Sequence, residues 1–318
     1  MSKIAPVLIV AYLREHNVLL LLEECIKFGA KKIYFAVDGA KSSEEKIIQE
    51  NFIREASSKC MKSKIDFKIW HRNTNLGPAV SVITALDWFF SKESSGIIFE
   101  DDLRISSSAL EYFTHQLNEY SESNVSLISG MMPWKNLKKE CQEFWSNYPL
   151  TWGWASWDSK WFEIRSIYDE EKLPDYSNMN LIEQLYWRIG NERCLMGFQD
   201  AWDIPMASYL KSEGKICILP FENYVTNVGF DANASNTREN VWPLNLELSS
   251  SLNLPVKSIP TFDKQCNLNH LIRKEIYKIS TRSLYTFPIR KILTQFKFSH
   301  LKNRKSIHER LKLVKIPT

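Results

Sequence analysis

Three adjacent carboxylates, Glu100, Asp101 and Asp102, directly follow the apolar segment 96–99. Negative charges this close repel one another, by about 1–4 kcal/mol per pair depending on the effective dielectric constant. A hard divalent cation relieves this repulsion, because such ions prefer carboxylate oxygens as ligands. The pattern therefore predicts a metal site at the end of a buried strand, with a solvated acidic turn as the alternative.

Alternating strands and helices must position these carboxylates. Continuous apolar, β-branched runs predict buried strands, and the longer segments between them have the length of helices. The sequence predicts strands over 4–11, 31–40, 64–72 and 95–102, and helices over 15–29, 43–59 and 79–91, with Gly29 ending the first helix. Strand–helix alternation repeated three times indicates an open α/β sheet that is mostly parallel.

Further polar residues stand at the ends of these strands. Arg14, Asp38 and the loop 72–77 each come at or just after a predicted strand. Open parallel sheets bind ligands beyond the carboxyl ends of their strands, so we expect one site there. The chain has no GxGxxG loop, no Walker loop and no G-x-S-x-G elbow, which argues against dinucleotide-binding, P-loop and serine hydrolase sites.

The carboxylate triplet at the end of a central strand resembles the metal site of GT-A fold glycosyltransferases. More narrowly, the chain is similar to the inverting N-acetylglucosaminyltransferase of N-glycan maturation and its bacterial surface-polysaccharide relatives. Further segments agree in order: "PVLIVAYLRE", "FAVDGA", "RNTNLGPAVSVITALDWFF", "TWGWASWDSKW", "WDIPM" and "ILPFENYVTNVGFDANASNT". The resemblance covers roughly residues 4–240. It departs at 235–237, which read Ser-Asn-Thr where bacterial relatives often carry Thr-His-Thr, so no histidine role is carried over.

The resemblance implies a GT-A (nucleotide-diphospho-sugar transferase) fold and gives roles to matched positions. A basic residue approaches the nucleotide, an acidic one holds the base or ribose, and a loop with the following helix closes over the nucleotide. These positions are Arg14, Asp38, Arg72, Asn75, Gly77 and Ser81. Asp102 is expected to bind Mn²⁺ or Mg²⁺ directly, while Glu100 and Asp101 orient the ribose, the donor sugar or the waters of the metal.

The sugar side of the expected site comes from two later segments. Transfer from a nucleotide sugar expels a diphosphate, whose charge a divalent metal stabilises, and an inverting displacement needs a carboxylate base for the acceptor hydroxyl. Asp203 matches the position of the base, with Asp200 second; a carboxylate that caps a helix is the alternative for either. The residues expected under the donor and acceptor sugars are Trp152, Gly153 and Trp154. A buried aromatic cluster explains the tryptophans, Trp157 included, almost equally well.

Charge divides the chain into two parts. Residues 271–318 carry 13 Lys and Arg against two Glu, whereas the rest of the chain has a net charge of −7. Prolines at 255 and 260 indicate a linker, so we divide the chain into a catalytic domain, 1–245, and a basic amphipathic extension, 246–318. We expect that extension to bind an anionic membrane surface; the alternative is that it packs against the acidic body of the protein. An acidic body argues against a nucleic-acid partner.

The cysteines and the apolar runs bear on the compartment. The cysteines are Cys25, Cys60, Cys141, Cys194, Cys217 and Cys266. Their spacing fits no zinc or redox motif, which predicts buried thiols in a reducing compartment. No apolar run has the length of a membrane span or the pattern of a signal peptide. We therefore expect a cytoplasmic protein, with peripheral contact at the inner face of the cell membrane.

These observations together predict a metal-dependent inverting glycosyltransferase. The donor is expected to be a nucleotide-diphosphate sugar, UDP-linked by resemblance, and the acceptor a sugar hydroxyl of a bacterial surface glycan precursor such as O-antigen or capsule, free or lipid-linked. Two alternatives stay open. One is a sugar nucleotidyltransferase, although the segment "AYLREHN" lacks the glycine-rich loop such an enzyme needs. The other is a protein that binds nucleotide sugars or glycans without transferase activity.

Overall fold

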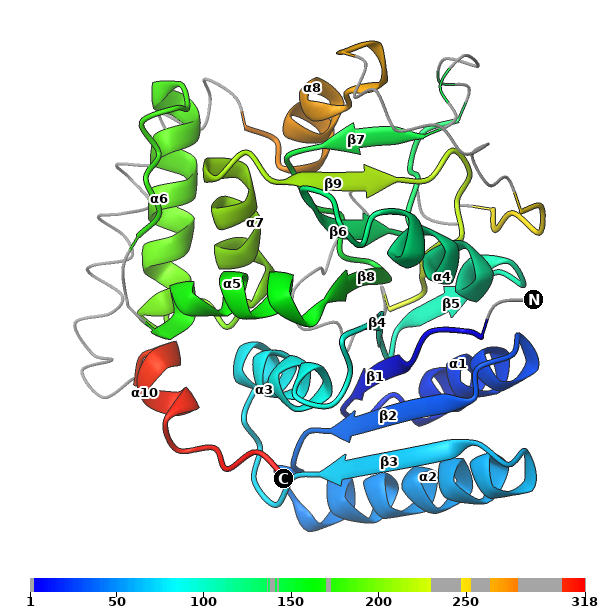
Figure 1. Ribbon diagram of the computed structural model, residues 1–318. Coiled ribbons are helices and arrows are strands. Elements are labelled where there is room, and N and C mark those ends of the chain that lie inside the picture. The colour runs from blue at the N-terminus through cyan, green and yellow to red at the C-terminus, as the bar shows by residue number, and fades with distance from the viewer. Residues whose placement is uncertain are drawn as a thin grey trace.

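A computed structural model describes residues 3–135, 137, 141, 143–169, 173–229, 247–252, 264–279 and 305–317. Within these ranges, eight strands form one sheet in the order β3-β2-β1-β4-β8-β6-β9-β7 (Figure 1). Its strands are β1 (Val7–Ala11), β2 (Lys32–Val37), β3 (Asp66–His71), β4 (Ser95–Glu100), β6 (Val125–Ser129), β7 (Phe144–Ser146), β8 (Trp154–Trp157) and β9 (Ile216–Leu219). Strands β1 to β4, β6 and β9 run in one direction, and only β7 and β8 run against them. The sheet is therefore mostly parallel, as the sequence predicts.

Helices cover both faces of the sheet. Because successive residues of a strand point to opposite faces, Val7 and Ile9 of β1 join one buried cluster and Leu8 and Val10 the other. The first cluster holds α1 (Glu15–Lys27), α2 (Ser43–Lys62) and α4 (Ala109–Glu119). The second holds α3 (Pro78–Phe90), α5 (Asp158–Asp169), α6 (Leu181–Leu195), α7 (Asp203–Ser212) and α10 (Ile307–Leu311). The first three predicted helices and first four strands are confirmed, with Gly29 at φ +103° just past the end of α1.

A small second sheet adds to the edge where β4 ends. Strand β5 (Leu103–Ile105) follows the carboxylate triplet and pairs antiparallel with β10 (Val225–Asn227). The Val228 N–H then donates to the Asp102 carbonyl at 2.8 Å. This pairing brings a segment more than a hundred residues away in the chain against the end of β4.

The described parts of the basic extension pack on the body. Residues 264–279 form η1 (Lys264–Cys266), α8 (Asn269–Leu271) and η2 (Ile272–Ile276), and the side chain of Ile272 is fully buried with Tyr148 and Trp187. Ile307 and Leu311 of α10 are buried in the layer that contains α3. These segments follow the packing alternative; the rest of the proposed lipid-binding region, 280–304, and most of the proposed linker lie outside the described residues. The boundary at 245 stays a prediction.

The prediction that all six cysteines are free thiols is wrong. Cys141 and Cys266 form a disulfide, with their Cα atoms 5.9 Å apart. The two residues are 125 positions apart in the sequence, so no local spacing announces the pair. Cys25, Cys60, Cys194 and Cys217 are buried free thiols, and burial raises the pKa of Cys60 and Cys194 to about 12, which makes them poor nucleophiles. Among the described residues, no helix has the length and apolar character needed to cross a bilayer.

Candidate active site

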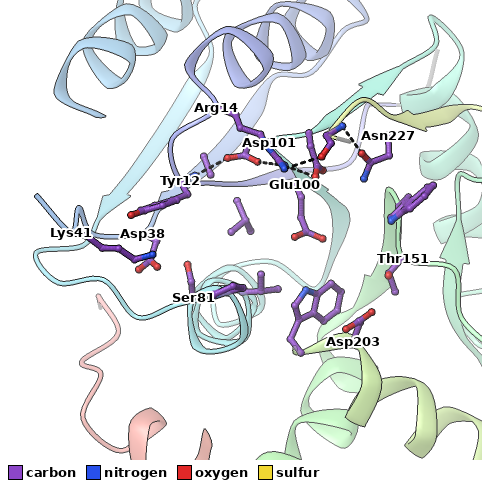
Figure 2. Close-up of a pocket in the computed structure, with 18 residues that line it drawn as sticks. Tyr12, Arg14, Asp38, Lys41, Ser81, Glu100, Asp101, Thr151, Asp203 and Asn227 are labelled. Atoms are coloured by element: carbon purple, nitrogen blue, oxygen red, sulfur yellow. Dashed lines mark hydrogen bonds and ion pairs between the residues drawn. The ribbon is translucent and has the colours of Figure 1, made fainter. Parts of the chain in front are cut away.

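A cleft of about 270 Å³ opens at the carboxyl ends of β1, β2 and β4 (Figure 2). Its opposite wall comes from the segment before β8, the start of α7 and the end of β10 with the residues that follow it. The predicted site residues that line it are Arg14, Asp38, Ser81, Glu100, Asp101, Asp102, Trp152 and Asp203. These eight predicted residues therefore lie around one cavity at the strand ends, and its function as a binding site stays a prediction.

Arg14 is the cation at the centre of the carboxylate triplet. Its Nη1 lies 2.5 Å from Asp102 Oδ2 and 3.3 Å from Asp101 Oδ1, while Nη2 donates to the Gly229 carbonyl at 3.2 Å. The Tyr12 N–H donates to the other oxygen of Asp101 at 2.8 Å. Arg14 thus offsets the repulsion between the two aspartates and ties β4 to the segment after β10.

Glu100 points from β4 into the cleft, toward the wall that carries Thr151 and Asp203 (Figure 2). Burial, and then the charges of Asp102 and Asp203, raise the pKa of Glu100 well above its ordinary value. Burial and Asp102 raise the pKa of Asp101 to about 6, against the opposing effect of Arg14. The cleft therefore holds more negative charge than Arg14 neutralises, and it favours protons or cations.

Asp203 is the first residue of α7 and lies across the cleft from Glu100. Burial raises the pKa of its carboxyl group, and the backbone N–H groups of Asp203 and Ile204 partly oppose this. The carboxylate lies at the N-terminus of α7, as the helix-capping alternative expects, and it also lines the cavity; its role as the base stays a prediction. A carboxylate with a raised pKa holds a proton more tightly than an ordinary carboxylate, which suits a proton acceptor.

Asp38 fastens the loop after β3. Its Oδ1 accepts from the N–H groups of Gly39 and Leu76, and its Oδ2 accepts from the Gly77 N–H and the Asn75 side-chain amide, all at 2.9–3.1 Å. Each oxygen thus already accepts two hydrogen bonds, which fills its lone-pair positions. Asp38 shapes the wall of the cleft, and Asn75 and Gly77 affect the cleft through their hydrogen bonds to Asp38. Contact of Asp38 with a base or ribose stays a prediction.

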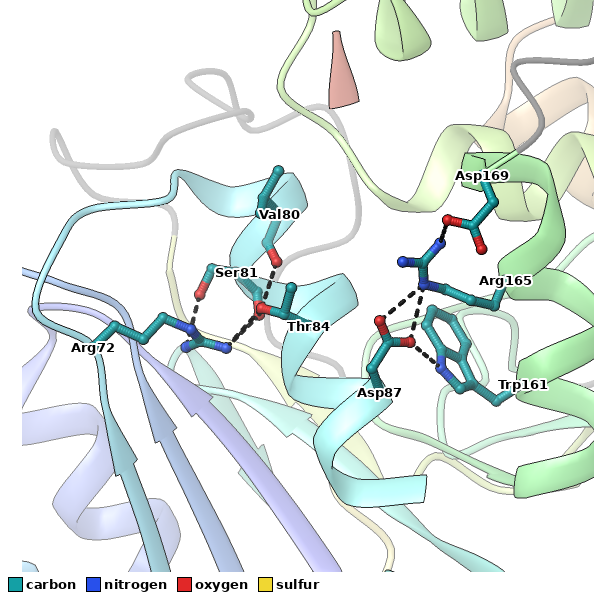
Figure 3. Close-up of polar contacts among 8 residues, drawn as sticks. All are labelled: Arg72, Val80, Ser81, Thr84, Asp87, Trp161, Arg165 and Asp169. Atoms are coloured by element: carbon teal, nitrogen blue, oxygen red, sulfur yellow. Dashed lines mark hydrogen bonds and ion pairs between the residues drawn. The ribbon is translucent and has the colours of Figure 1, made fainter. Parts of the chain in front are cut away.

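Arg72 lies behind the cleft. Its Nη2 donates to the Ser81 carbonyl at 2.9 Å and to Thr84 Oγ1 at 3.0 Å (Figure 3). Its guanidinium lies 4.1 Å from the ring centroid of Trp70. This fixes the first turns of α3. Farther along the helix, Asp87 accepts from Trp161 Nε1 and Arg165 Nε, at 2.8 and 2.9 Å. Helix α3 is thereby held at both ends, so Ser81 is rigidly presented to the cavity.

Asp200, Gly153 and Trp154 lie outside the cleft lining. Asp200 forms an ion pair with Arg310 and accepts from the Ala79 N–H, so it caps α3. Trp154 is 1% exposed and stacks on Trp202 at 5.9 Å between ring centroids, and Trp157 is buried too. The buried-cluster alternative thus holds for both, and of the predicted sugar contacts only Trp152 faces the cavity.

The lining residues that sequence reasoning missed include Tyr12, Lys41, Thr151 and Asn227, whose polar side chains could contact a ligand. The Tyr12 hydroxyl donates to Glu45 at 2.6 Å, and Lys41 Nζ lies 5.3 Å from the centroid of its ring. Tyr12 and Lys41 follow the ends of β1 and β2, so the rule that placed Arg14 and Asp38 could have found them. Thr151 directly precedes Trp152, whereas Asn227 enters only through the pairing of β10 with β5.

The carboxylates fit one kind of metal site and not another. Among the described residues, no three His, Cys, Asp or Glu side chains are grouped as the ligands of one ion. Arg14 already contacts the metal-ligand candidate, Asp102. The donor set therefore does not fit a cage built by the protein alone. It fits an ion such as Mg²⁺ or Mn²⁺ that takes one or two carboxylates and completes its shell with water and substrate phosphates.

Comparison with known proteins adds little to this geometry. No known family profile and no curated protein matches the sequence. Among solved structures, UDP-glucose pyrophosphorylase complexed with UDP-glucose is 13% identical, with 70% of this chain and 90% of that chain covered and a TM-score of 0.38. HddC from Yersinia pseudotuberculosis is 12% identical, with 49% and 77% covered and a TM-score of 0.32. Mannose-1-phosphate geranyltransferase from Thermus thermophilus is 8% identical, with 70% and 75% covered and a TM-score of 0.35. Likeness this remote identifies no activity, so the function has to be inferred from the cleft.

Replacing Gly77 is expected to damage both the fold and the cleft. Its φ is +74°, and an added Cβ would lie 2.3 Å from Asp200 Oδ2. Gly77→Ala should therefore lower the free energy of unfolding by about 1–3 kcal/mol, from strain and from the displaced carboxylate. Urea denaturation measures this change. Gly214→Ala is the matched control, since φ there is +62° with no atom within 4 Å of the added Cβ; equal losses in the two variants would refute the role of the contact with Asp200.

Proposed function

We propose that the protein is a nucleotide-sugar transferase, and within that class a glycosyltransferase that inverts the configuration of the transferred sugar. The observation that supports this is the cleft itself. An acidic strand end held by Arg14 faces a further carboxylate, Asp203, across a cavity at the carboxyl ends of parallel strands. Open α/β sheets bind their ligands at this edge. A GT-A fold is part of the proposal.

The β4 side of the cleft suits the diphosphate of the donor. Asp102, with Asp101, would hold Mn²⁺ or Mg²⁺, which when bound offsets the charge that develops on the leaving diphosphate. Arg14 Nη1 contacts both aspartates, so it sets their orientation and supplies a fixed positive charge beside them. The Tyr12 N–H fixes the second oxygen of Asp101.

The α7 side suits the acceptor. In an inverting displacement the acceptor oxygen bonds to the anomeric carbon while the bond from that carbon to the diphosphate breaks. The hydroxyl proton passes to a carboxylate oxygen of Asp203, whose raised pKa favours taking it. Trp152 and Thr151 border the same part of the cleft and offer a ring face and a hydroxyl to a sugar.

The acceptor class and the location are finer parts of the proposal. We infer a sugar hydroxyl on a lipid-linked or free surface-glycan precursor, used by a cytoplasmic enzyme at the inner face of the membrane. The described end of the extension supports contact with anionic lipid, since Leu313 and Ile316 are 67% and 39% exposed beside the exposed side chains of Lys312 and Lys315.

A sugar nucleotidyltransferase is the second candidate. It would use the same cleft for its nucleotide, with the same acidic strand end beside the phosphates. The two reactions differ in their products. A glycosyltransferase releases UDP from a UDP-sugar, whereas a nucleotidyltransferase supplied with pyrophosphate converts the UDP-sugar to UTP and a sugar 1-phosphate.

The test is a calorimetric and thermal-shift screen of UDP, GDP, CMP and dTDP with their sugars, with and without Mn²⁺. Because the described residues build no cage of ligands in the cleft, we expect Mn²⁺ alone to bind weakly and to bind well together with one nucleotide. A complex at 100 times its dissociation constant should add about 2.7 kcal/mol to the free energy of unfolding, and a chelator should remove this gain.

Two variants and one assay make the screen decisive. Asp102→Asn should abolish the dependence on Mn²⁺, whereas Asp66→Asn, an exposed carboxylate at the far end of β3, should keep it. Release of UDP, or formation of UTP when pyrophosphate is added, separates the two transferases. If no nucleotide stabilises the wild-type protein with metal present, the transferase proposal fails.

A further inference from the structure

The C-terminal helix α10 is anchored beside the loop that precedes α3 (Figure 1). A capping box between Ser306 and Glu309 starts it, and the side chains of Ile307 and Leu311 are buried against the layer of α3, α5 and α6. The chain enters α10 past Gly197, where an added Cβ would lie 2.6 Å from the Lys305 carbonyl oxygen. This short helix therefore has one fixed position on the body.

Arg310 projects from α10 to two acceptors in that loop region. Its Nη1 lies 3.1 Å from Asp200 Oδ1, and its Nη2 donates to the Leu76 carbonyl. The arginine side chain is 24% exposed, so the contacts are partly shielded from water. Asp200 in turn accepts from the Ala79 N–H at 3.3 Å. Because Gly77 has no side chain and Pro78 has no N–H, this distant carboxylate takes the place of a local N-cap for α3.

The contact with Leu76 continues into the cleft wall. The peptide unit between Leu76 and Gly77 is held on both sides, since its carbonyl accepts from Arg310 and its N–H donates to Asp38 Oδ2. Asp38 and Ser81, on either side of this peptide, line the cleft. Displacing Arg310 would free the carbonyl and loosen the turn that presents both residues.

We propose that Arg310 is a positioning residue for the nucleotide, and that docking of α10 and nucleotide binding are coupled. The proposal rests on the nucleotide-binding function proposed above. Coupling between two sites is reciprocal. An intact Arg310 contact should therefore tighten nucleotide binding, and bound nucleotide should protect α10 from local opening.

The experiment measures the dissociation constant of UDP with Mn²⁺ by calorimetry in full-length variants. Arg310→Ala and the milder Arg310→Gln should weaken UDP binding by about fivefold or more, within the usual range of coupling. Arg310→Lys should recover part of that loss, since it keeps a charge that can reach one of the two acceptors. Lys315→Ala, which removes a cation from the exposed end of the same segment, should stay within twofold of wild type.

A second measurement reads the coupling without any substitution. Hydrogen exchange of the amides in 307–311 should slow when UDP and Mn²⁺ bind the wild-type protein, and this protection should shrink in Arg310→Gln. A folded Ala or Gln variant that binds UDP as wild type does would overturn the coupling alone. So would unchanged exchange in the wild-type protein, even where both variants unfold. Failure of the wild type to bind any nucleotide would instead overturn the proposed function, and the coupling with it.

Discussion

Asp203→Asn should lower the rate of sugar transfer by about 10²–10⁴-fold while making the protein more stable. The rate falls because the substitution removes the carboxylate opposite Glu100. Among the described residues of the lining, it is the only carboxylate on the α7 side of the cleft. The gain in stability follows from the raised pKa of Asp203, because a raised carboxyl pKa means that folding disfavours the charged form. Asparagine keeps the shape of the side chain and removes that charge.

The pH dependence of this variant has a definite sign. The folded state binds the proton of Asp203 more tightly than the unfolded state does, so ionisation destabilises the wild type as pH rises from the ordinary pKa of 3.8 through the raised one. The stability advantage of Asp203→Asn should therefore be full above the raised pKa and vanish below about pH 4. Wild-type transfer should fall as pH drops through the raised pKa.

Matched variants separate catalysis from structure. Asp200→Asn removes a carboxylate that pairs with Arg310 outside the cleft, so it should reduce stability and leave the rate per bound donor within about tenfold of wild type. Steady-state kinetics and urea denaturation give both quantities. If Asp203→Asn retained full turnover while Asp200→Asn lost it, the base would have to be reassigned.

Arg14→Met should lower the free energy of unfolding, because Arg14 is the counter-charge of the acidic end of β4. Removing one partner of a buried ion pair costs about 3–5 kcal/mol, and we expect about 2–3 here because the Arg14 side chain is 21% exposed. The aspartates 101 and 102 would then repel each other without a counter-charge. Nucleotide binding should fall as well, since the orientation of both carboxylates depends on the same guanidinium.

The defect of Arg14→Met should be relieved by acid. Arg14 lowers the pKa of Asp101, so its loss raises that pKa further, and protonation at lower pH removes the repulsion. Denaturation midpoints measured from pH 7 to pH 5 should therefore converge with those of the wild type. Arg54→Met, on the exposed face of α2, is the control and should change stability by less than about 0.5 kcal/mol at every pH. A constant difference across this range would contradict the assignment.

Sequence patterns predicted the parallel half of the sheet because its signals are local. The apolar runs of β1, β2 and β4 indicate buried strands, and the polar residues after them could be placed at one edge by topology alone. The roles of Arg72 and Asp38 could not be predicted this way. Whether a polar side chain faces a cavity or fastens a loop depends on partners such as Thr84 for Arg72 and Leu76 for Asp38, which only the folded chain brings near.

The other wall of the cleft depends on long-range pairing, which leaves no local signal. Asn227 reaches the site because β10 pairs with β5, and the Cys141–Cys266 disulfide joins segments 125 residues apart. Asp203 was found through resemblance to a motif. Trp154 came from the same resemblance, and the fold buries its side chain as the partner of Trp202. A motif locates a segment, and the packing decides which of its side chains meets the substrate.

The packing of α3 limits how this cleft could change during evolution. Every residue from Ala79 to Phe90 is buried, so a substitution that reshaped this wall would first unsettle the core. Lys41, Thr151 and Asn227 stand at or beyond the ends of strands around the same cavity, where exchanges cost the fold little. Relatives that use other sugars would be expected to differ at these three positions and to keep α3 nearly unchanged.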